Sequence, residues 1–261
     1  MRVVAILSCV VVGAVVAGSD EKPTAKTIRV LTYNIHHGEG TDGKVDLPRL
    51  AAVIAGVKPD LVALQEVDHK TKRTGGVDQT AELARLTGLR GKFGKAIDYQ
   101  GGEYGQAILS RHPIKGVEVH VLPGEPERET RIAVAAEIPL GDSGRTIRFV
   151  TTHLHHQSDE FRKRQAAKLD EMFGRGGTPV IVAGDLNATP DSKPLGKLAK
   201  NWKSAEVGKP LLTFPVDKPA KQIDYVLVRP ADKFKVTAAR VLDEAVASDH
   251  RALLVVLELP E

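Results

Sequence analysis

The sequence predicts a layered α+β fold in which two β-sheets pack against each other. Three observations favour it: apolar runs of strand length are numerous, amphipathic helical segments are few, and several connections are hairpin-length turns rich in Gly and Pro. Of the 261 residues, 42% are hydrophobic and 27% charged, a composition typical of a folded globular protein and too apolar for a disordered one. No internal repeat or long polar linker divides the chain, so we expect a single domain.

The first half of the chain combines strands with two helices. Thr27 to Tyr33 alternates between two faces in the manner of a strand. Asp46 can cap a helix, because apolar residues follow it at the spacing i, i+3, i+4 and i+7, from Leu50 to Val57, and Pro59 comes soon after. The next predicted elements are a short buried strand at Leu61–Leu64, a weaker helix at Asp78–Leu86 and a strand at Ala107–Ser110 that Pro113 stops.

The second half reads as strands around one basic helix. That helix covers Ser158–Phe173 and places Phe161, Leu169, Met172 and Phe173 on its apolar side. Turns such as Pro123-Gly124 and Gly141-Asp142-Ser143-Gly144 separate the strands. The predicted strands are Val117–Leu122, Ile132–Ile138, Thr146–Thr152, Val180–Ala183, Ile223–Val228, Val236–Val241 and Leu253–Leu257.

The N-terminal segment has the pattern of a signal peptide. Arg2 precedes an apolar stretch from Val3 to Val16, and the small residues Ala17-Gly18-Ser19 follow. About 14 apolar residues fall short of the 18 or more that a membrane-spanning helix needs, so a retained anchor is the less favoured alternative. A lipoprotein signal at Cys9, the one cysteine, leaves only residues 3–8 after Arg2. We therefore expect residues 1–17, or 1–19, to direct export to the periplasm or the exterior, 18–26 to form a linker and 27–261 the domain.

Polar side chains follow the apolar strands at many of their ends. Such groups must be hydrated, paired or bound to a ligand, and a sheet fixes them while leaving them open to a cleft. The hard oxygens of Glu66, Asp185, Asp249 and the Asn34 amide suit Mg²⁺ or Mn²⁺. The absence of cysteine from the expected mature chain, and of any HExxH pair, argues against a structural or protease-type zinc site.

Seven short strings carry these polar residues: LTYNI (31–35), LQEV (64–67), AILSRHPI (107–114), THL (152–154), GDLN (184–187), IDYV (223–226) and SDH (248–250). Each is weak alone. Together and in this order they resemble the motifs of the endonuclease/exonuclease/phosphatase superfamily, over essentially the whole predicted domain. The resemblance implies a four-layer α/β/β/α sandwich of two packed mixed β-sheets, as in deoxyribonuclease-type enzymes, and hydrolysis of phosphate esters assisted by a divalent metal ion.

The resemblance also implies roles for individual residues. Glu66 resembles the principal metal ligand, with Asn34 and Asp249 completing the metal and water shell around Mg²⁺, or alternatively Mn²⁺. A one-metal site and a metal that moves during the reaction are both compatible with these ligands.

Five further residues resemble the catalytic set of the family. Asp185 matches the residue that orients or deprotonates the attacking water, and Asn187 the amide that holds a phosphate oxygen. His250, paired with Asp224, matches one catalytic imidazole, and His153 a histidine that faces the scissile phosphate. The sequence does not decide which imidazole is the general acid. Taken singly, each residue has a structural explanation such as a turn, a cap or a loop ion pair.

Several other residues have two interpretations. Arg131 is either a phosphate-facing arginine or a surface charge, and Gln106 stands where many relatives carry an Asn that contacts the phosphate. His36 and His37 either line the cleft or are inert. His155 and His156 could bind an adventitious transition-metal ion. The basic segments Lys70–Arg73 and Arg162–Arg164 are either charged surface or attract anions toward the cleft.

The sequence leaves the substrate open. The net charge of +4 is a mild bias toward anionic partners, nucleic acid or a phospholipid headgroup among them. Aromatic residues make up only 4%, and neither a basic stretch interleaved with aromatics for base stacking nor an aromatic-rich hairpin for a membrane surface is visible. We expect an exported monomeric phosphodiesterase or phosphomonoesterase without a stable membrane span after processing. The alternative is a catalytically silent family member that binds a phosphorylated ligand, which the complete set of site residues disfavours.

Overall fold

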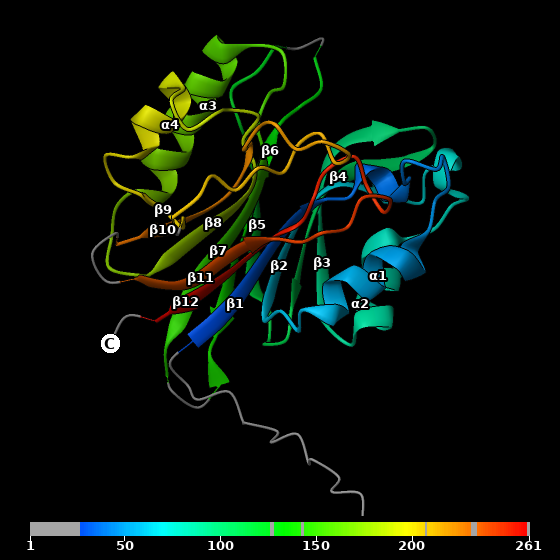
Figure 1. Cartoon of the computed structure of the whole chain (residues 1–261), viewed down its shortest axis with the longest axis horizontal. Coiled ribbons are helices and arrows are strands. Elements are labelled where there is room, and N and C mark those ends of the chain that lie inside the picture. Colours follow the sequence, from blue (N-terminus) through cyan, green and yellow to red (C-terminus); the bar gives the residue numbers. More distant parts are fainter. Residues whose placement is uncertain (1–26, 126–127, 142–143, 207, 231–233, 260–261) are drawn as a thin grey trace, which may run out of the picture.

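Two mixed six-stranded sheets form the centre of the fold (Figure 1). The computed structural model describes residues 27–125, 128–141, 144–206, 208–230 and 234–259. The first sheet has the spatial order β11 (Lys235–Val241), β12 (Leu253–Glu258), β1 (Thr27–Asn34), β2 (Leu61–His69), β4 (Gly102–Ser110), β3 (Arg90–Tyr99). The second has the order β5 (Lys115–Val121), β6 (Ile132–Pro139), β7 (Thr146–His153), β8 (Val180–Asp185), β10 (Asp224–Arg229), β9 (Lys203–Ser204).

Helices cover the outer face of each sheet, so the implied four-layer α/β/β/α sandwich is confirmed (Figure 1). The first sheet carries α1 (Leu47–Gly56) and α2 (Gln79–Thr87), and the second carries α3 (Asp159–Phe173) and α4 (Lys193–Leu198). Two short 3₁₀ helices, η1 (His36–Gly38) and η2 (Lys72–Thr74), follow β1 and β2. The predicted cap of α1 is confirmed, because Asp46 Oδ1 accepts a hydrogen bond from the Arg49 backbone N–H at 2.9 Å.

Three apolar cores hold the layers together. The central core lies between the sheets, where Ile28 and Ile108 of the first sheet meet Val134 and Phe149 of the second. Leu50 and Ile54 of α1 pack on the outer face of the first sheet, and Leu169 and Phe173 of α3 on that of the second. Burying these side chains is the main favourable contribution to folding.

Within each sheet the two central strands run parallel to each other, and a crossover helix joins them. In the first sheet α1 connects β1 to β2, and in the second α3 connects β7 to β8. Each sheet therefore presents the carboxyl ends of two neighbouring strands at one edge. Strands that are antiparallel to these, β12 beside β1 and β10 beside β8, begin at that same edge.

Most predicted strands and helices are confirmed. Strand β3, helix α4, the two-residue strand β9 and the two 3₁₀ helices were not predicted. Strand β2, predicted to end at Leu64, continues to His69 beyond a bulge between Leu64 and Val67. Strand β4 starts at Gly102, before the predicted Ala107. Among the described residues, no helix has the length and apolarity that crossing a membrane requires. The predicted signal peptide and linker, and part of the turn at residues 141–144, lie outside the described residues.

Candidate active site

The strand edge described above brings the predicted site residues together. Asn34 ends β1, and Glu66 lies in the neighbouring β2. His153 and Asp185 end β7 and β8 and are paired in register. Asp224 opens β10 directly opposite Asp185, since these strands are antiparallel.

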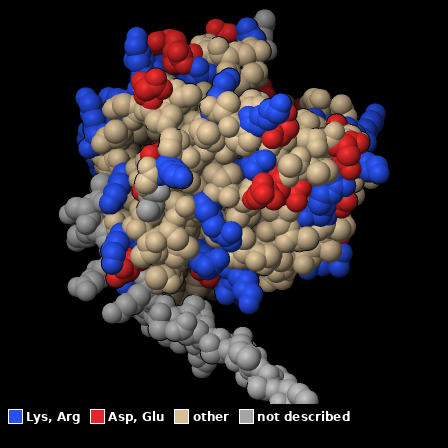
Figure 2. Space-filling model, in the orientation of Figure 1, with Lys and Arg blue, Asp and Glu red and all other residues tan. Residues whose placement is uncertain are grey.

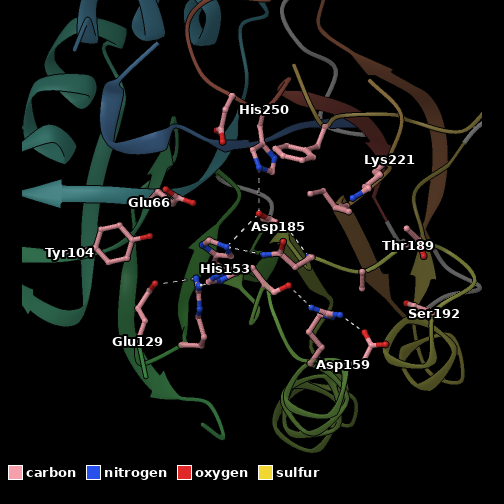
Figure 3. Close-up of a pocket in the computed structure, with 18 of the residues that line it drawn as sticks. Glu66, Tyr104, Glu129, His153, Asp159, Asp185, Thr189, Ser192, Lys221 and His250 are labelled. Carbon is pink, nitrogen blue, oxygen red and sulfur yellow. Dashed lines mark hydrogen bonds and ion pairs between the residues drawn. The ribbon is translucent and has the colours of Figure 1, made fainter. Parts of the chain in front are cut away.

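The last contribution comes from the segment before β12. Because Leu253 pairs with Thr32 of β1, the preceding Asp249 and His250 reach the carboxyl end of β1. His250 and Asp185 therefore come from opposite sheets and meet at the edge of the sandwich, where Figure 3 shows them pointing toward each other.

Asp185 lies at the centre of this cluster and is 1% exposed. Its Oδ1 accepts a hydrogen bond from the Asn187 backbone N–H at 2.8 Å, and its Oδ2 accepts one from Asn34 Nδ2 at 3.2 Å. The same Oδ2 lies 3.4 Å from His153 Nε2 and 3.7 Å from His250 Nε2. Burial, and then the neighbouring Asp224 charge, raise the pKa of the Asp185 carboxyl. This carboxyl can exchange a proton near neutral pH, as a general base must.

His250 is paired with a buried carboxylate. Its Nδ1 donates to Asp224 Oδ2 at 2.9 Å, and the same oxygen accepts a hydrogen bond from Thr213 Oγ1 at 2.6 Å. Burial alone would lower the pKa of His250, but the Asp224 carboxylate outweighs it and raises this pKa to about 10. The imidazole is therefore protonated at neutral pH. The Phe214 ring packs against it with a centroid distance of 4.9 Å.

His153 is held in the opposite protonation state. Burial, followed by the positive charge of Arg131, lowers the pKa of His153 well below its usual range. Its Nε2 lies 3.0 Å from Asn187 Nδ2, which also donates to the Leu154 carbonyl at 3.1 Å. Asn187 has a φ of 48°, a left-handed conformation that asparagine tolerates better than most residues. The turn after β8 thus points the Asn187 amide toward the imidazole.

The three predicted metal ligands also meet here. Glu66 occupies the β2 bulge with a φ of 58°, and its Oε1 accepts a hydrogen bond from Asn34 Nδ2 at 3.0 Å. Asp249 and Glu66 line the same cavity. A bulge often redirects a side chain next to an active site. The carboxylate oxygens of Glu66 and Asp249 fit a hard divalent cation, whereas the Asn34 amide oxygen accepts the His36 backbone N–H at 3.1 Å.

A cavity of about 830 Å³ opens over these residues (Figure 3). The predicted residues Glu66, Arg131, His153, Asp185, Asn187, Asp249 and His250 line one part of it. Asn34 and Asp224 lie behind this surface, bonded to Asp185 and His250 respectively. The other walls were not predicted from the sequence and include Tyr99, Tyr104, Glu129, Asp159, Thr189, Asp191, Ser192, Phe214 and Lys221.

Three arginines that line this cavity are each paired with a carboxylate. Arg131 is paired with Glu129 at 3.2 Å, Arg162 with Asp159, and Arg73 with the buried Asp68. Arg73 and Arg162 come from the two basic segments, so one member of each segment faces the cavity. Arg73 also stacks on the Tyr99 ring at 4.7 Å from its centroid. The aromatic and acidic wall residues carry no local sequence pattern, because only the packing of distant strands brings them together.

The structure decides some of the open interpretations. Arg131 is 4% exposed and faces the cavity, so it is not a surface charge. The expected phosphate contact of Gln106 is not supported: its amide is buried and donates to the Ile132 carbonyl at 2.9 Å, and Gln106 does not line the cavity. His155 Nδ1 accepts the Gln157 and Ser158 backbone N–H groups. Among the described residues, neither His155 nor His156 belongs to a group of three metal-binding side chains.

Comparison with known proteins identifies the family. A model described as the Endonuclease/Exonuclease/phosphatase family matches residues 31–250. The chain belongs to this family. Within it, the crystal structure of an endonuclease/exonuclease/phosphatase from Beutenbergia cavernae is similar, with a TM-score of 0.77 and 28% identity, covering 90% of this chain and 72% of that one.

Two proteins of known sequence are also similar to this family member. The uncharacterized protein YbhP of Escherichia coli K12 is 28% identical over 242 residues, which cover 87% of this chain and 94% of YbhP. Human nocturnin is 26% identical over 202 residues, covering 66% of this chain and 46% of nocturnin. The match thus spans nearly the full length of YbhP and about half the length of nocturnin.

Proposed function

We propose that the chain is a divalent-metal-dependent hydrolase of phosphate esters, phosphodiesters above all. One observation carries the proposal. The buried Asp185 carboxylate lies within 3.7 Å of two imidazoles that are held in opposite protonation states, at the wall of an open cavity. An isolated structural ion pair needs no such arrangement, whereas acid–base catalysis does. Membership of the endonuclease/exonuclease/phosphatase family supports the same reaction class.

In the proposed reaction, Asp185 orients a water molecule in line with the phosphorus atom and accepts its proton. The bond from the water oxygen to phosphorus forms while the bond from phosphorus to the leaving oxygen breaks. His250, held by Asp224, gives its Nε2 proton to that leaving oxygen. The Arg131 guanidinium stabilises charge on the phosphoryl oxygens, and the Asn187 amide joins it by exchanging its hydrogen bond to the Leu154 carbonyl for one to the substrate. His153 stays neutral and holds the Asn187 amide in place.

Asn34, Glu66 and Asp249 would hold the divalent ion, which we propose to be Mg²⁺ or Mn²⁺. Their side chains fit, because Glu66 and Asp249 line one cavity and offer carboxylate oxygens, and Asn34 Nδ2 donates to Glu66 Oε1 at 3.0 Å and so orients that carboxylate. When bound, such an ion supplies positive charge that stabilises the phosphoryl oxygens.

The charge pattern favours a compact ester over a long polyanion. Three cavity arginines are each paired with a carboxylate, so the cavity does not form a continuous basic track. Figure 2 shows lysine and arginine side chains mixed with acidic ones on one face of the molecule. A nucleic-acid groove normally has a basic stripe that follows the phosphate backbone.

A panel of substrates tests the proposal. Full-length protein is assayed with bis(p-nitrophenyl) phosphate, sugar phosphates, phospholipid and plasmid DNA, with Mg²⁺ or Mn²⁺ and with EDTA. We expect metal-dependent turnover of at least one small ester, abolished by EDTA and strongly reduced in Glu66→Gln. Binding of phosphate esters without turnover of any of them would instead support the silent binding protein.

We also propose that residues 1–17 direct export. The support is the sequence alone: one positive charge, an apolar stretch and small residues at the expected cleavage site. Expression with a C-terminal tag in a bacterial host, followed by fractionation and N-terminal sequencing, tests this. Export predicts a processed chain outside the cytoplasm, and an intact chain in the cytoplasm would refute it.

A further inference from the structure

Two histidines lie beside Glu66, and the proposed reaction uses neither of them. His36 and His37 form the start of η1, directly after β1. One imidazole nitrogen of each and a carboxylate oxygen of Glu66 all lie within 4.8 Å of one another. The two rings meet edge to face with a centroid distance of 4.5 Å.

Glu39 contacts one nitrogen of each imidazole. His36 Nδ1 donates to the Glu39 carbonyl at 3.2 Å, and His37 Nε2 lies 3.5 Å from the Glu39 carboxylate. Metal-binding histidines typically donate their second ring N–H to a backbone carbonyl or a carboxylate, which fixes the tautomer. Here this pattern leaves a lone pair on His36 Nε2 and another on His37 Nδ1.

The free nitrogen of His37 is buried without a partner. His37 is 9% exposed, and its Nδ1 has no hydrogen-bond partner among the described residues. An unsatisfied buried polar atom destabilises the folded chain, and a bound cation would remove that penalty. In addition, His36, His37 and Glu66 all have left-handed backbones, with φ of 46°, 44° and 58°. The chain adopts three unfavourable conformations to place these side chains.

We infer that His36, His37 and Glu66 form a site for a first-row transition-metal ion. Imidazole nitrogens favour transition metals such as Zn²⁺ and Co²⁺, whereas Mg²⁺ prefers oxygen ligands. Two histidines and one carboxylate with open positions also match a common catalytic zinc ligand set. With metal–ligand bonds of about 2.1 Å, the ligands of a tetrahedral site lie about 3.4 Å from one another, so the separations of at most 4.8 Å shorten by up to about 1.4 Å when the site closes.

This inference rests on the proposed function only through Glu66, which both sites share. The set Asn34, Glu66 and Asp249 offers oxygens alone, whereas His36 and His37 add two nitrogens on the side of η1. The chain would therefore bind a transition-metal ion more tightly than Mg²⁺, and the difference would depend on the two histidines.

Metal titration of the full-length, EDTA-stripped chain tests the site. Isothermal titration calorimetry with CoCl₂ and with MgCl₂ compares the wild type with His36→Asn and His37→Asn, since asparagine tolerates the left-handed backbone. Glu39→Gln removes only the carboxylate behind His37. His120→Asn is the matched control, because His120 also pairs with a glutamate, Glu118 at 3.0 Å, on the distant β5. Thermal melts confirm that each variant folds.

We expect Co²⁺ to bind the wild type at least about tenfold more tightly than Mg²⁺. Each histidine variant should weaken Co²⁺ binding by at least about tenfold, and Glu39→Gln by a similar factor, with Mg²⁺ affinity nearly unchanged. His120→Asn should match the wild type. Pulsed EPR of bound Mn²⁺ should detect two coupled imidazole nitrogens in the wild type and one in each histidine variant. If His37→Asn does not fold, His36→Asn and Glu39→Gln carry the test.

Co²⁺ binding that is unchanged in His36→Asn and Glu39→Gln, or Mn²⁺ spectra without nitrogen coupling, would overturn the inference. Such a result leaves the proposed function intact if Mg²⁺ supports turnover. Conversely, histidine-dependent Co²⁺ binding in a chain that hydrolyses no ester would support the metal site and refute the proposed reaction.

Discussion

Replacing Asp224 by asparagine separates the charge of this residue from its shape. Asp224 is 1% exposed, and its Oδ2 accepts hydrogen bonds from His250 and Thr213. Its Oδ1 has no hydrogen-bond partner among the described residues, so the NH₂ group of asparagine can take that position without breaking a bond. Asp224→Asn therefore keeps both hydrogen bonds and removes only the negative charge that holds His250 in its protonated form.

The expected changes in stability and in kcat follow from the hydrogen bonds kept and the charge lost. Losing the charge but keeping both bonds should cost about 1–2 kcal/mol of unfolding free energy. Asp224→Ala, which leaves His250 buried without its partner, should cost about 3–5 kcal/mol. If His250 is the general acid, Asp224→Asn should lower kcat by about 10²–10⁴-fold, because a positioned acid or base contributes that much. This corresponds to about 2.7–5.4 kcal/mol of activation free energy.

Hydrolysis of bis(p-nitrophenyl) phosphate, followed by absorbance, measures the change in kcat, and urea unfolding measures the stability. Asp42→Asn is the matched control, since Asp42 also pairs with a cation, Arg49 at 2.9 Å, but does not line the cavity. An Asp224→Asn variant that folds and retains wild-type kcat would refute the assignment of the His250–Asp224 pair to catalysis.

Three further changes test the fold and the buried histidine. Because folded His153 has a lowered pKa, only the unfolded chain takes up its proton as pH falls below about 6.5. His250 and Asp185, whose folded pKa values are raised, have the opposite effect in both proteins, so the test is the difference: the unfolding free energy of the wild type minus that of His153→Gln should fall between pH 7.5 and pH 5.5 in urea unfolding. Gly184→Ala would place a Cβ 1.9 Å from the Thr152 carbonyl oxygen, so we expect a loss of more than about 3 kcal/mol or insoluble protein, whereas Gly196→Ala, with nothing within 4 Å, should fold normally. Phe149→Ala in the central core should lower the unfolding free energy by about 3–5 kcal/mol, and a smaller loss would mean that the two sheets are less tightly packed than described.

Local sequence patterns predicted the elements that are stabilised by contacts between residues close in the sequence. Asp46 caps α1 and apolar residues recur at helical spacing behind it, so the helix can be read from ten consecutive positions. In the same way, GDLN joins a buried strand to a turn, and the structure places Asp185 and Asn187 at that point. Residues at parallel strand ends converge for a topological reason, which explains why the separate motifs form one cluster.

Strand β3 could not be predicted because its residues have low strand propensity. Gly91, Lys92, Gly94 and Lys95 form a strand through pairing along the whole of β4. Gly94 is required by a distant contact, since a Cβ there would lie 2.2 Å from a Val134 methyl group of the other sheet. Tyr104 and Glu129 likewise could not be predicted as cavity residues, because they face the cavity only after both sheets have packed. The β2 bulge at Glu66 was missed because its polar residues suggested that the strand had ended.

The most direct measurement of the central claim is the metal-dependent turnover of bis(p-nitrophenyl) phosphate by the wild type and by Asp185→Ala. The account predicts turnover with Mg²⁺ or Mn²⁺, none with EDTA, and a loss of at least about 10²-fold in kcat for a folded Asp185→Ala variant. Turnover that survives EDTA, or an Asp185→Ala variant as active as the wild type, would contradict it.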